Sequence, residues 1–493
     1  MKSPRSILLL LPLLPRLALA DVSGPAPSPA ASPILMAPPS AGLPAYPAVV
    51  RQETPAQHDA RIAWFREARF GIFIHWGVFS ALAGTWQGRP AGAEWIMNNA
   101  RIPVAAYKAQ ASRFTASQYD PKAWAQLAQD AGARYVVITA KHHEGFTLYG
   151  SSASDWNAVT ASGAHRDLLQ PLVDALRGRG IKFGAYYSQS QDWVNPGGSK
   201  GKVQPWDPAQ NGDFDEYLRK VSLPQVREIL DRYHPDILWW DTEYQMTPER
   251  ARPFFDLVVS HPAVLMNSRL GGGVLGDFRT SEQHIPASAM LGRQLEVNMT
   301  INDSWGYNAA DTHWKSRRQL IQNLSDISSK DGNYLLNIGP TAEGVVPQPE
   351  VDRLLEIGRW LKLNGEAIYG TRGGPYVQPP VWGRTTQRVW AGGPATLYLH
   401  IWDWPADGKI VLPGITQTPR SGRLLAGGAP VVSTVTPEGL VVTLPGSAPD
   451  PDVSVAALEF ASAPQVASAQ ALPQDTGASG TLADPSGRTT PHP

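Results

Sequence analysis

A helix followed by a short apolar strand that ends in a carboxylate is the feature that most limits the fold of this chain. The helix-like run Val221–Tyr233 passes through the breaker His234-Pro235 into Ile237–Trp240, and Asp241 follows at once. A run that is apolar along its whole length is typical of a parallel strand covered on both faces. Enzymes built on closed parallel barrels place their chemistry at such strand ends. The segment therefore predicts a barrel strand with a functional residue at its end.

The same unit recurs through the middle of the chain. Asp120-Pro121 predicts the start of a helix, with proline in the first turn, and the buried strand Tyr135–Thr139 follows it. Roughly eight such strands over about 300 residues favour a closed (β/α)8-like barrel over an open sheet. Weak helix signals from Leu265 to Asn302 predict an irregular stretch. The other elements expected are the helix Leu168–Arg177 and the strands Phe70–Ile74, Lys182–Tyr187, Val264–Met266, a stretch near Phe278, and Tyr334–Ile338.

The pattern changes after about Gly373. Six short runs between Thr396 and Phe460 are separated by Gly, Pro and Asp turns, with no helix signal between them, which predicts a small antiparallel β-sandwich. A structural appendage is the favoured role for it, and carbohydrate binding is the alternative. The expected organisation is a signal peptide (1–20), a Pro/Ala-rich leader (21–50), the catalytic barrel (51–372), the sandwich (373–460) and a disordered tail (461–493).

The N-terminus has the order of regions found in secretory signals. Lys2 and Arg5 precede the apolar run Ile7–Leu14, and the small-residue end Ala18–Ala20 comes just before Asp21. The apolar run is too short to span a bilayer, and no later segment is long and apolar enough. We therefore expect an exported protein, periplasmic or secreted, without a membrane span.

Composition excludes several functional classes. The 43 Lys and Arg balance the 43 Asp and Glu, and no basic block stands out, so a nucleic-acid or acidic-membrane partner is not expected. The chain has no Cys, which excludes a thiol nucleophile, a thiolate metal site and disulfides. Most of the 17 Trp are expected in the core, and a few could stack on sugar faces. Nothing here indicates the oligomeric state.

Hydrogen-bonding side chains follow six of the predicted strands. One such residue alone is weak evidence, but parallel strands bring their ends to one rim, so six together indicate a functional site. In strand order these residues are His75; Lys141, His142, His143 and Glu144; Tyr186, Tyr187 and Ser188; Asp241; Asn267 and Arg269; and Glu282.

Three chemistries compete for such a rim. His142 and His143 are adjacent and point to opposite faces of an extended chain, and no His-x-His or His-Glu-x-x-His is present, so a metal site is disfavoured. No Gly-x-Ser-x-Gly elbow follows a strand, which disfavours a serine hydrolase. A pair of carboxylates suits glycoside hydrolysis, with Asp241 as nucleophile and either Glu282 or Glu296 as its partner. No metal or organic cofactor is needed for that reaction.

Seven motifs between about Arg61 and Gly370 then point to one family. They are Arg69–Gly77, Glu94-Trp95, Lys141–Phe146, Tyr186–Ser188, Leu238–Asp241, Ser304–Asn308 and Leu335–Pro340. In this order they resemble the α-L-fucosidases of glycoside hydrolase family 29. The resemblance implies a retaining exo-hydrolase with a (β/α)8-like catalytic domain and a C-terminal β-sandwich, acting on fucosylated oligosaccharides or glycoconjugates.

The resemblance also implies roles for individual residues. Asp241 matches the nucleophile. The segment Gly276–Pro286 resembles the one that carries the acid/base, which favours Glu282, although Ser281 replaces the usual Pro; Glu296 is the alternative. The residues implied to contact the sugar are His75, Glu94, Trp95, His142, His143, Tyr187 (with Tyr186 as the alternative), Arg269, and Trp305 near the sugar's methyl group.

Two other functions stay open from the sequence. One is a hydrolase of a related sugar such as an α-L-galactoside, and the other is a non-catalytic fucose-binding protein on the same scaffold. The linkage preference depends on loops at the leaving-group side, among them Trp193–Trp206.

Overall fold

A computed structural model describes residues 46–289, 294–376 and 378–466 of the chain. The predicted signal peptide (1–20), and most of the predicted leader and tail, lie outside these residues. Within the described ranges, none of the helices has both the length and the apolar character needed to cross a bilayer.

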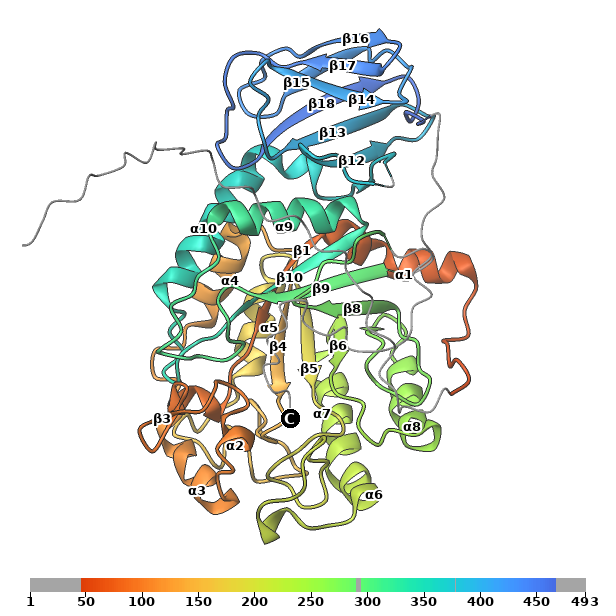
Figure 1. The fold of residues 1–493 in the computed structure, drawn as a ribbon. Helices are drawn as coiled ribbons and strands as arrows, with labels where there is room; N and C mark the ends of the chain where they lie inside the picture. The colour runs from red at the N-terminus through yellow and green to blue at the C-terminus, as the bar shows by residue number, and fades with distance from the viewer. Residues whose placement is uncertain (1–45, 290–293, 377, 467–493) are drawn as a thin grey trace, which may run out of the picture. The chain divides into compact units, whose positions relative to one another are not determined.

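Eight parallel strands form a nearly closed barrel, as the sequence predicted (Figure 1). Their order around the barrel is β7-β6-β5-β4-β1-β10-β9-β8. The first and last strands of this order meet at a single parallel bridge, between Asn267 and Phe278. The strands are β1 (Phe70–Ile74), β4 (Tyr135–Lys141), β5 (Lys182–Tyr187), β6 (Ile237–Trp240), β7 (Leu265–Met266), β8 (Phe278–Glu282), β9 (Gln294–Thr300) and β10 (Gly332–Ile338).

Helices connect most of the strands and cover the outside of the barrel (Figure 1). The predicted start of α4 is confirmed: Pro121 lies in the first turn, and the Asp120 side chain accepts hydrogen bonds from the backbone N–H groups of Lys122 and Ala123. In the described part of the chain no helix separates β7, β8 and β9, so the predicted irregular stretch is also confirmed. The connecting helices are α4 (Pro121–Asp130), α5 (Leu169–Arg177), α6 (Phe214–Tyr217), α7 (Leu223–Tyr233), α8 (Pro248–Val259), α9 (Arg317–Ser329) and α10 (Gln348–Asn364); α1 (Pro55–Ala68) precedes the barrel, and α2 (Ile96–Asn99) and α3 (Val104–Lys108) lie after β1.

The strands are apolar on both faces because each face packs against a different core. Phe73 of β1 belongs to the cluster inside the barrel, together with Tyr186 and Trp239, whereas its neighbour Ile72 packs outward with the helices. Phe65 of α1 joins the inner cluster, with its ring centroid 4.5 Å from that of Phe278. The barrel is therefore filled by side chains below the rim, and only the carboxyl ends of the strands are left for chemistry.

After the barrel the chain forms two antiparallel sheets, of strand order β11-β12-β13-β18-β15 and β14-β17-β16. They enclose a separate apolar core that includes Leu399 and Leu440, as expected for a sandwich. Ion pairs join this region to α9, among them Arg384 with Asp326. The strands are β11 (Arg372–Gly373), β12 (Gly383–Val389), β13 (Ala395–Ile401), β14 (Lys409–Pro413), β15 (Ser421–Leu424), β16 (Val432–Thr436), β17 (Gly439–Thr443) and β18 (Ser454–Phe460); the hairpin of β2 (Thr85–Trp86) and β3 (Arg89–Pro90) lies after β1.

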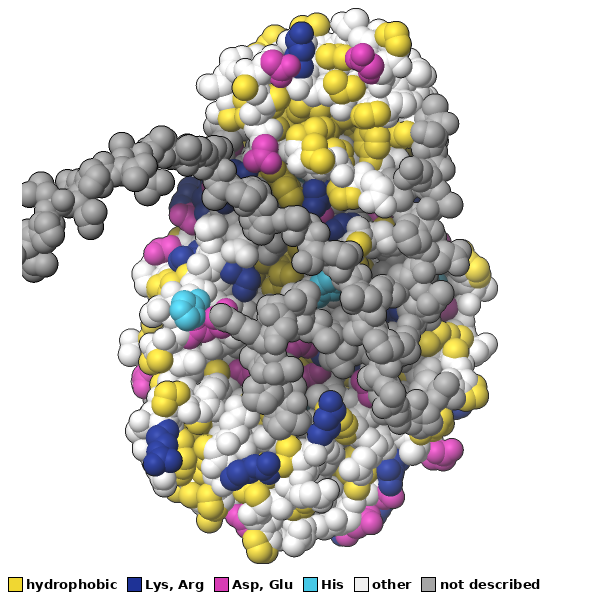
Figure 2. Space-filling model, viewed as in Figure 1, with side chains coloured by type: hydrophobic (Ala, Val, Ile, Leu, Met, Phe, Trp, Pro, Cys, Tyr) yellow, Lys and Arg dark blue, Asp and Glu magenta, His cyan; other side chains and the backbone are white. Residues whose placement is uncertain are grey.

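Charged side chains of both signs are interspersed over the described residues of the face seen in Figure 2. No broad patch of one sign is visible among them, in keeping with the balanced composition.

Candidate active site

Asp241 lies at the centre of a cluster of hydrogen-bond donors at the carboxyl end of β6. One carboxylate oxygen accepts hydrogen bonds from Arg269 Nη1 (2.9 Å) and from the backbone N–H of Thr242 (2.9 Å). The other oxygen accepts one from the Tyr186 hydroxyl (2.7 Å) and lies 3.5 Å from His143 Nε2. These hydrogen bonds hold the carboxylate firmly. The Asp241 side chain is 15% exposed, so it still reaches solvent. This is the environment expected of an anionic nucleophile with a fixed direction of attack.

The two strongest donors to Asp241 keep their protons. Burial, together with the charge of Asp241, raises the pKa of Tyr186 well above its ordinary value, so its hydroxyl stays a donor. Burial lowers the pKa of Arg269, but the carboxylates of Glu282 and Asp241 outweigh it and raise that pKa above its ordinary value. Arg269 Nε is fixed by the Thr280 hydroxyl (2.7 Å). The guanidinium is therefore a permanent, oriented cation at the site.

Glu282 shares that guanidinium with Asp241. Its Oε2 lies 3.0 Å from Arg269 Nη1, the same nitrogen that binds Asp241 at 2.9 Å. Two oxygens that both contact one nitrogen at these lengths are at most about 6 Å apart, which includes the range of retaining glycosidases. Glu282 is 20% exposed at the last position of β8. It lies at the rim beside Asp241, and Arg269 bonds both carboxylates.

Glu296, the alternative acid/base, lies deeper in the barrel. In the parallel register of β8 and β9, Thr280 is opposite Glu296 and Glu282 is opposite Asn298, so Glu296 is two residues below the rim. It is fully buried, and its two oxygens accept hydrogen bonds from the Tyr135 hydroxyl (2.7 Å) and Trp239 Nε1 (2.7 Å). Burial raises the pKa of Glu296 to about 7.

Two neutral histidines and an indole line the rim beside β1 and β4. Burial lowers the pKa of His75 to about 4, and burial with the nearby His143 lowers that of His142 well below its ordinary value. The ring of His75 lies 5.1 Å from that of Trp305, and His142 stacks on Tyr186 with centroids 5.4 Å apart. This side of the site thus offers neutral hydrogen-bonding groups next to a flat apolar face.

Asn337 fixes the direction of His75. The amide nitrogen of Asn337 donates to the carbonyl of Trp305 (2.7 Å), which leaves its Oδ1 as the acceptor for His75 Nδ1 at 2.6 Å. His75 therefore carries its proton on Nδ1. No role for Asn337 is predicted from the sequence, although Asn337 and Asn333 are the two amide side chains of the buried strand β10, and that was the available signal.

Glu94 and Trp95 lie on the same rim, in the segment after the β2–β3 hairpin. Glu94 Oε2 accepts a hydrogen bond from the backbone N–H of Gly306 (2.8 Å), so it is tied to the loop that carries Trp305. The ring of Trp95 lies 5.0 Å from that of His143. The structure thus brings both residues to the other predicted sugar contacts.

The preference for Tyr187 over Tyr186 is corrected by the structure. Successive residues of a strand point to opposite faces, so only one of the two can face Asp241. That residue is Tyr186. Tyr187 points outward and is fully buried against α7, where its hydroxyl donates to Gln225 Oε1 (2.8 Å). The other residues predicted to contact the sugar lie at the rim with Asp241 and Glu282, and Glu296 lies below it; the roles assigned to them remain predictions. Lys141, Ser188 and Asn267 are fully buried.

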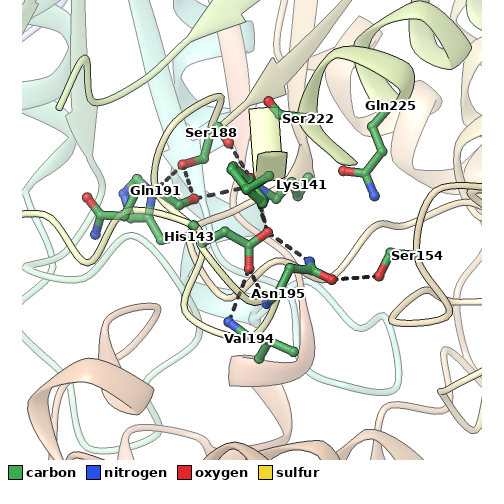
Figure 3. Close-up of polar contacts among 12 residues, drawn as sticks. Lys141, His143, Ser154, Ser188, Gln191, Val194, Asn195, Ser222 and Gln225 are labelled. Carbon is green, nitrogen blue, oxygen red and sulfur yellow. Dashed lines mark hydrogen bonds and ion pairs between the residues drawn. The ribbon is translucent and has the colours of Figure 1, made fainter. Parts of the chain in front are cut away.

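A buried ion pair supports the rim under His143 (Figure 3). Lys141 Nζ lies 3.1 Å from Asp192 Oδ2, and both side chains are fully buried. Asp192 Oδ1 in turn accepts hydrogen bonds from the backbone N–H groups of Val194 and Asn195. The pair joins the end of β4 to the loop after β5.

Two groups of carboxylates and histidines in the described residues are close enough together to hold a metal ion. They are Glu53, His58 and Asp277, and Asp303, Asp311 and His313. In the first group Arg61 already bonds Glu53 and Asp277. Neither group contains a residue of the candidate site.

Comparison with known proteins agrees with this geometry. Residues 48–366 match the family model for α-L-fucosidase. The tissue α-L-fucosidase of Homo sapiens is 34% identical over 412 residues, covering 78% of this chain and 85% of that protein. The solved α-L-fucosidase isoenzyme 1 of Paenibacillus thiaminolyticus is 35% identical with a TM-score of 0.73, over 82% of this chain and 99% of that one. The Thermotoga maritima α-fucosidase, solved with a mechanism-based inhibitor, is 31% identical with a TM-score of 0.67, over 80% and 96%. The chain belongs to the α-L-fucosidases, family 29 of the glycoside hydrolases.

Proposed function

We propose that this α-L-fucosidase is an exported, retaining exo-enzyme that releases terminal α-L-fucosyl residues from oligosaccharides or glycoconjugates. The observation that carries the retaining mechanism is that one guanidinium nitrogen of Arg269 contacts both Asp241 and Glu282. This shared contact limits the distance between the two contacting carboxylate oxygens to at most about 6 Å. An inverting enzyme needs a wider gap, because a water molecule must fit between its base and the sugar. The Thermotoga relative bound to a mechanism-based inhibitor supports the same chemistry.

In the first step Asp241 attacks the anomeric carbon while Glu282 protonates the leaving oxygen. Tyr186 and Arg269 hold the attacking carboxylate, and the hydrogen bond from Thr242 fixes its direction. In the second step Glu282, now ionised, takes a proton from water, and the water oxygen displaces Asp241 from the sugar. Two inversions at one carbon return the original configuration.

The acid/base is assigned to Glu282 because of access. Glu282 is partly exposed at the rim, whereas both oxygens of Glu296 are bonded inside the barrel, two residues deeper. A proton donor must reach the leaving oxygen, and a fully buried carboxyl at that depth does not.

The sugar is proposed to lie between the histidines and Trp305. His75, His142 and His143, with Glu94, supply directional hydrogen bonds to hydroxyl groups. Trp305 supplies a flat apolar face for the methyl group of a 6-deoxy sugar. The indole of Trp95, which lies 5.0 Å from the ring of His143, is proposed to pack on the sugar ring.

A direct assay tests this function. Purified enzyme is mixed with an aryl α-L-fucoside, and the first product anomer is followed by NMR; α-L-fucose is expected first. Initial release of the β-anomer would contradict retention, and preference for an α-L-galactoside would change the substrate. Binding of fucose without turnover would indicate a binding protein.

Export is tested separately, through the mature N-terminus. N-terminal sequencing of protein recovered outside the cytoplasm is expected to begin at Asp21. Recovery of the intact N-terminus inside the cell would contradict export and would leave the enzymatic proposal untouched.

A further inference from the structure

The hydroxyl of Ser188 lies between an imidazole and a carbonyl. Its Oγ is 2.7 Å from His143 Nδ1 and 2.8 Å from the carbonyl oxygen of Gln191 (Figure 3). A carbonyl oxygen only accepts hydrogen bonds, and a serine has one hydroxyl proton. Two oxygens 2.8 Å apart repel each other unless that proton lies between them, so Ser188 donates to Gln191. The remaining contact then needs a proton from the histidine, and His143 must carry one on Nδ1.

The other nitrogen of His143 faces the reaction centre. Nε2 lies 3.5 Å from Oδ2 of Asp241. With the proton on Nδ1, a neutral ring turns its Nε2 lone pair toward the carboxylate. A lone pair facing an anion is unfavourable, and a hydroxyl group that donates to Nε2 relieves it. A sugar bound at Asp241 brings such hydroxyl groups.

Ser188 is itself held rigidly. Its carbonyl accepts a hydrogen bond from Lys141 Nζ (2.7 Å), and its backbone N–H donates to the carbonyl of Lys141 (3.1 Å). Lys141 also pairs with Asp192, which bonds the loop that carries Gln191. Ser188, Gln191, Lys141 and Asp192 are fully buried and His143 is 1% exposed, so water does not compete for the hydroxyl.

We propose that Ser188 is a positioning residue that keeps the proton of His143 on Nδ1, so that Nε2 accepts a hydrogen bond from one hydroxyl group of the sugar at Asp241. The part that concerns the sugar rests on the proposed function. The part that concerns the proton rests on the geometry of Ser188, His143 and Gln191 alone.

NMR on the full-length protein labelled with 15N-histidine tests which ring nitrogen of His143 carries the proton. The His143 signals are identified by their loss in His143→Gln, since the chain has 11 His. In wild type the neutral ring is expected to be protonated on Nδ1, and in Ser188→Ala a substantial fraction is expected on Nε2. A neutral wild-type ring protonated on Nε2, or a ring that stays doubly protonated up to pH 9, would overturn the proposal.

Ser222→Ala is the matched control for loss of a buried serine. Ser222 is also fully buried, and its hydroxyl donates to the carbonyl of Gln189 (2.7 Å) without touching His143. Both variants should lose similar thermal stability, but only Ser188→Ala should change the His143 spectrum. We expect kcat/KM on an aryl fucoside to fall about 10-fold in Ser188→Ala and by less than about 2-fold in Ser222→Ala. Equal losses in the two variants would mean that Ser188 is merely structural.

Three aryl fucosides, each lacking a different one of the sugar's hydroxyl groups, show which hydroxyl group His143 binds. The penalty of Ser188→Ala should persist on two of the three deoxy sugars and vanish on the one that lacks the hydroxyl bound by His143. The same penalty on all three would overturn the sugar contact. Failure of wild type to hydrolyse any fucoside would instead remove the proposed function, and the NMR result on the His143 proton would still stand.

Discussion

Tyr186 and Tyr187 allow a sharp test of the site, because they are adjacent, fully buried and both hydrogen-bonded through their hydroxyl groups. Tyr186→Phe removes the donor that lies 2.7 Å from Asp241. A hydrogen bond to a charged group contributes about 1.5–3 kcal/mol, which corresponds to a loss of about 10- to 150-fold in kcat/KM. The loss should be mainly in kcat, because the attacking carboxylate loses one of the hydrogen bonds that hold it, while those from Arg269 and Thr242 remain.

Tyr187→Phe is the control at the same depth in the same strand. It removes the hydrogen bond to Gln225 on the helix side and leaves Asp241 untouched. Steady-state kinetics on an aryl fucoside and thermal denaturation should be measured for both variants. Both should lose comparable stability, on the order of 1 kcal/mol, and only Tyr186→Phe should lose activity. Full activity in Tyr186→Phe, or equal kinetic losses in both, would refute this account of the site.

Asp241→Gly should lose several orders of magnitude in kcat, and added azide should restore turnover as a fucosyl azide of inverted configuration; near wild-type activity would remove Asp241 from the mechanism. Glu282→Ala should lose far more activity on a fucosylated oligosaccharide than on an activated aryl fucoside, since only the former leaving group needs a proton; that dependence in Glu296→Ala instead would transfer the role. Trp305→Ala should relax discrimination between fucoside and galactoside by about 10- to 200-fold, and an unchanged ratio would assign specificity elsewhere. Because burial raises the pKa of Glu296 from 4.5 to about 7, its contribution to stability is greatest below pH 4.5 and is lost as the pH rises through 7. The free energy of unfolding of wild type relative to Glu296→Gln should therefore fall by about 3 kcal/mol between pH 4 and 8 in paired denaturant titrations, and a flat difference would contradict the burial argument.

Sequence patterns located those strands that are apolar on both faces. Phe70–Ile74, Lys182–Tyr187 and Ile237–Trp240 are predicted with the same bounds that the structure has. Strand β9 is missed because Glu296 and its alternate neighbours point into the barrel while Val297 and the others pack outward. That alternation looks like a half-exposed strand, and only the closed barrel shows that both faces are buried.

The sequence predicts which strand ends carry the site, but it does not predict which side chains at those ends point into the barrel. Which of Tyr186 and Tyr187 meets Asp241 depends on which residue of β5 first points inward, and a strand with aromatic residues on both faces carries no signal for that. The choice between Glu282 and Glu296 depends on depth along the barrel axis. That depth is set by the register of β8 against β9, which is a property of the assembled sheet.

The seam of the barrel has a consequence for how such an enzyme can change. The strand of Asp241 is paired along both sides, with β5 and β7, whereas β8, the strand of Glu282, is fully paired only with β9 and meets Asn267 at one bridge. The short connection between β7 and β8 contains no helix that would have to be repacked. Insertions and deletions in that connection can therefore shift β8, and with it the carboxyl of Glu282, relative to Asp241. Such a shift would change the separation of the two carboxyls, which decides whether a glycosidase retains or inverts the configuration.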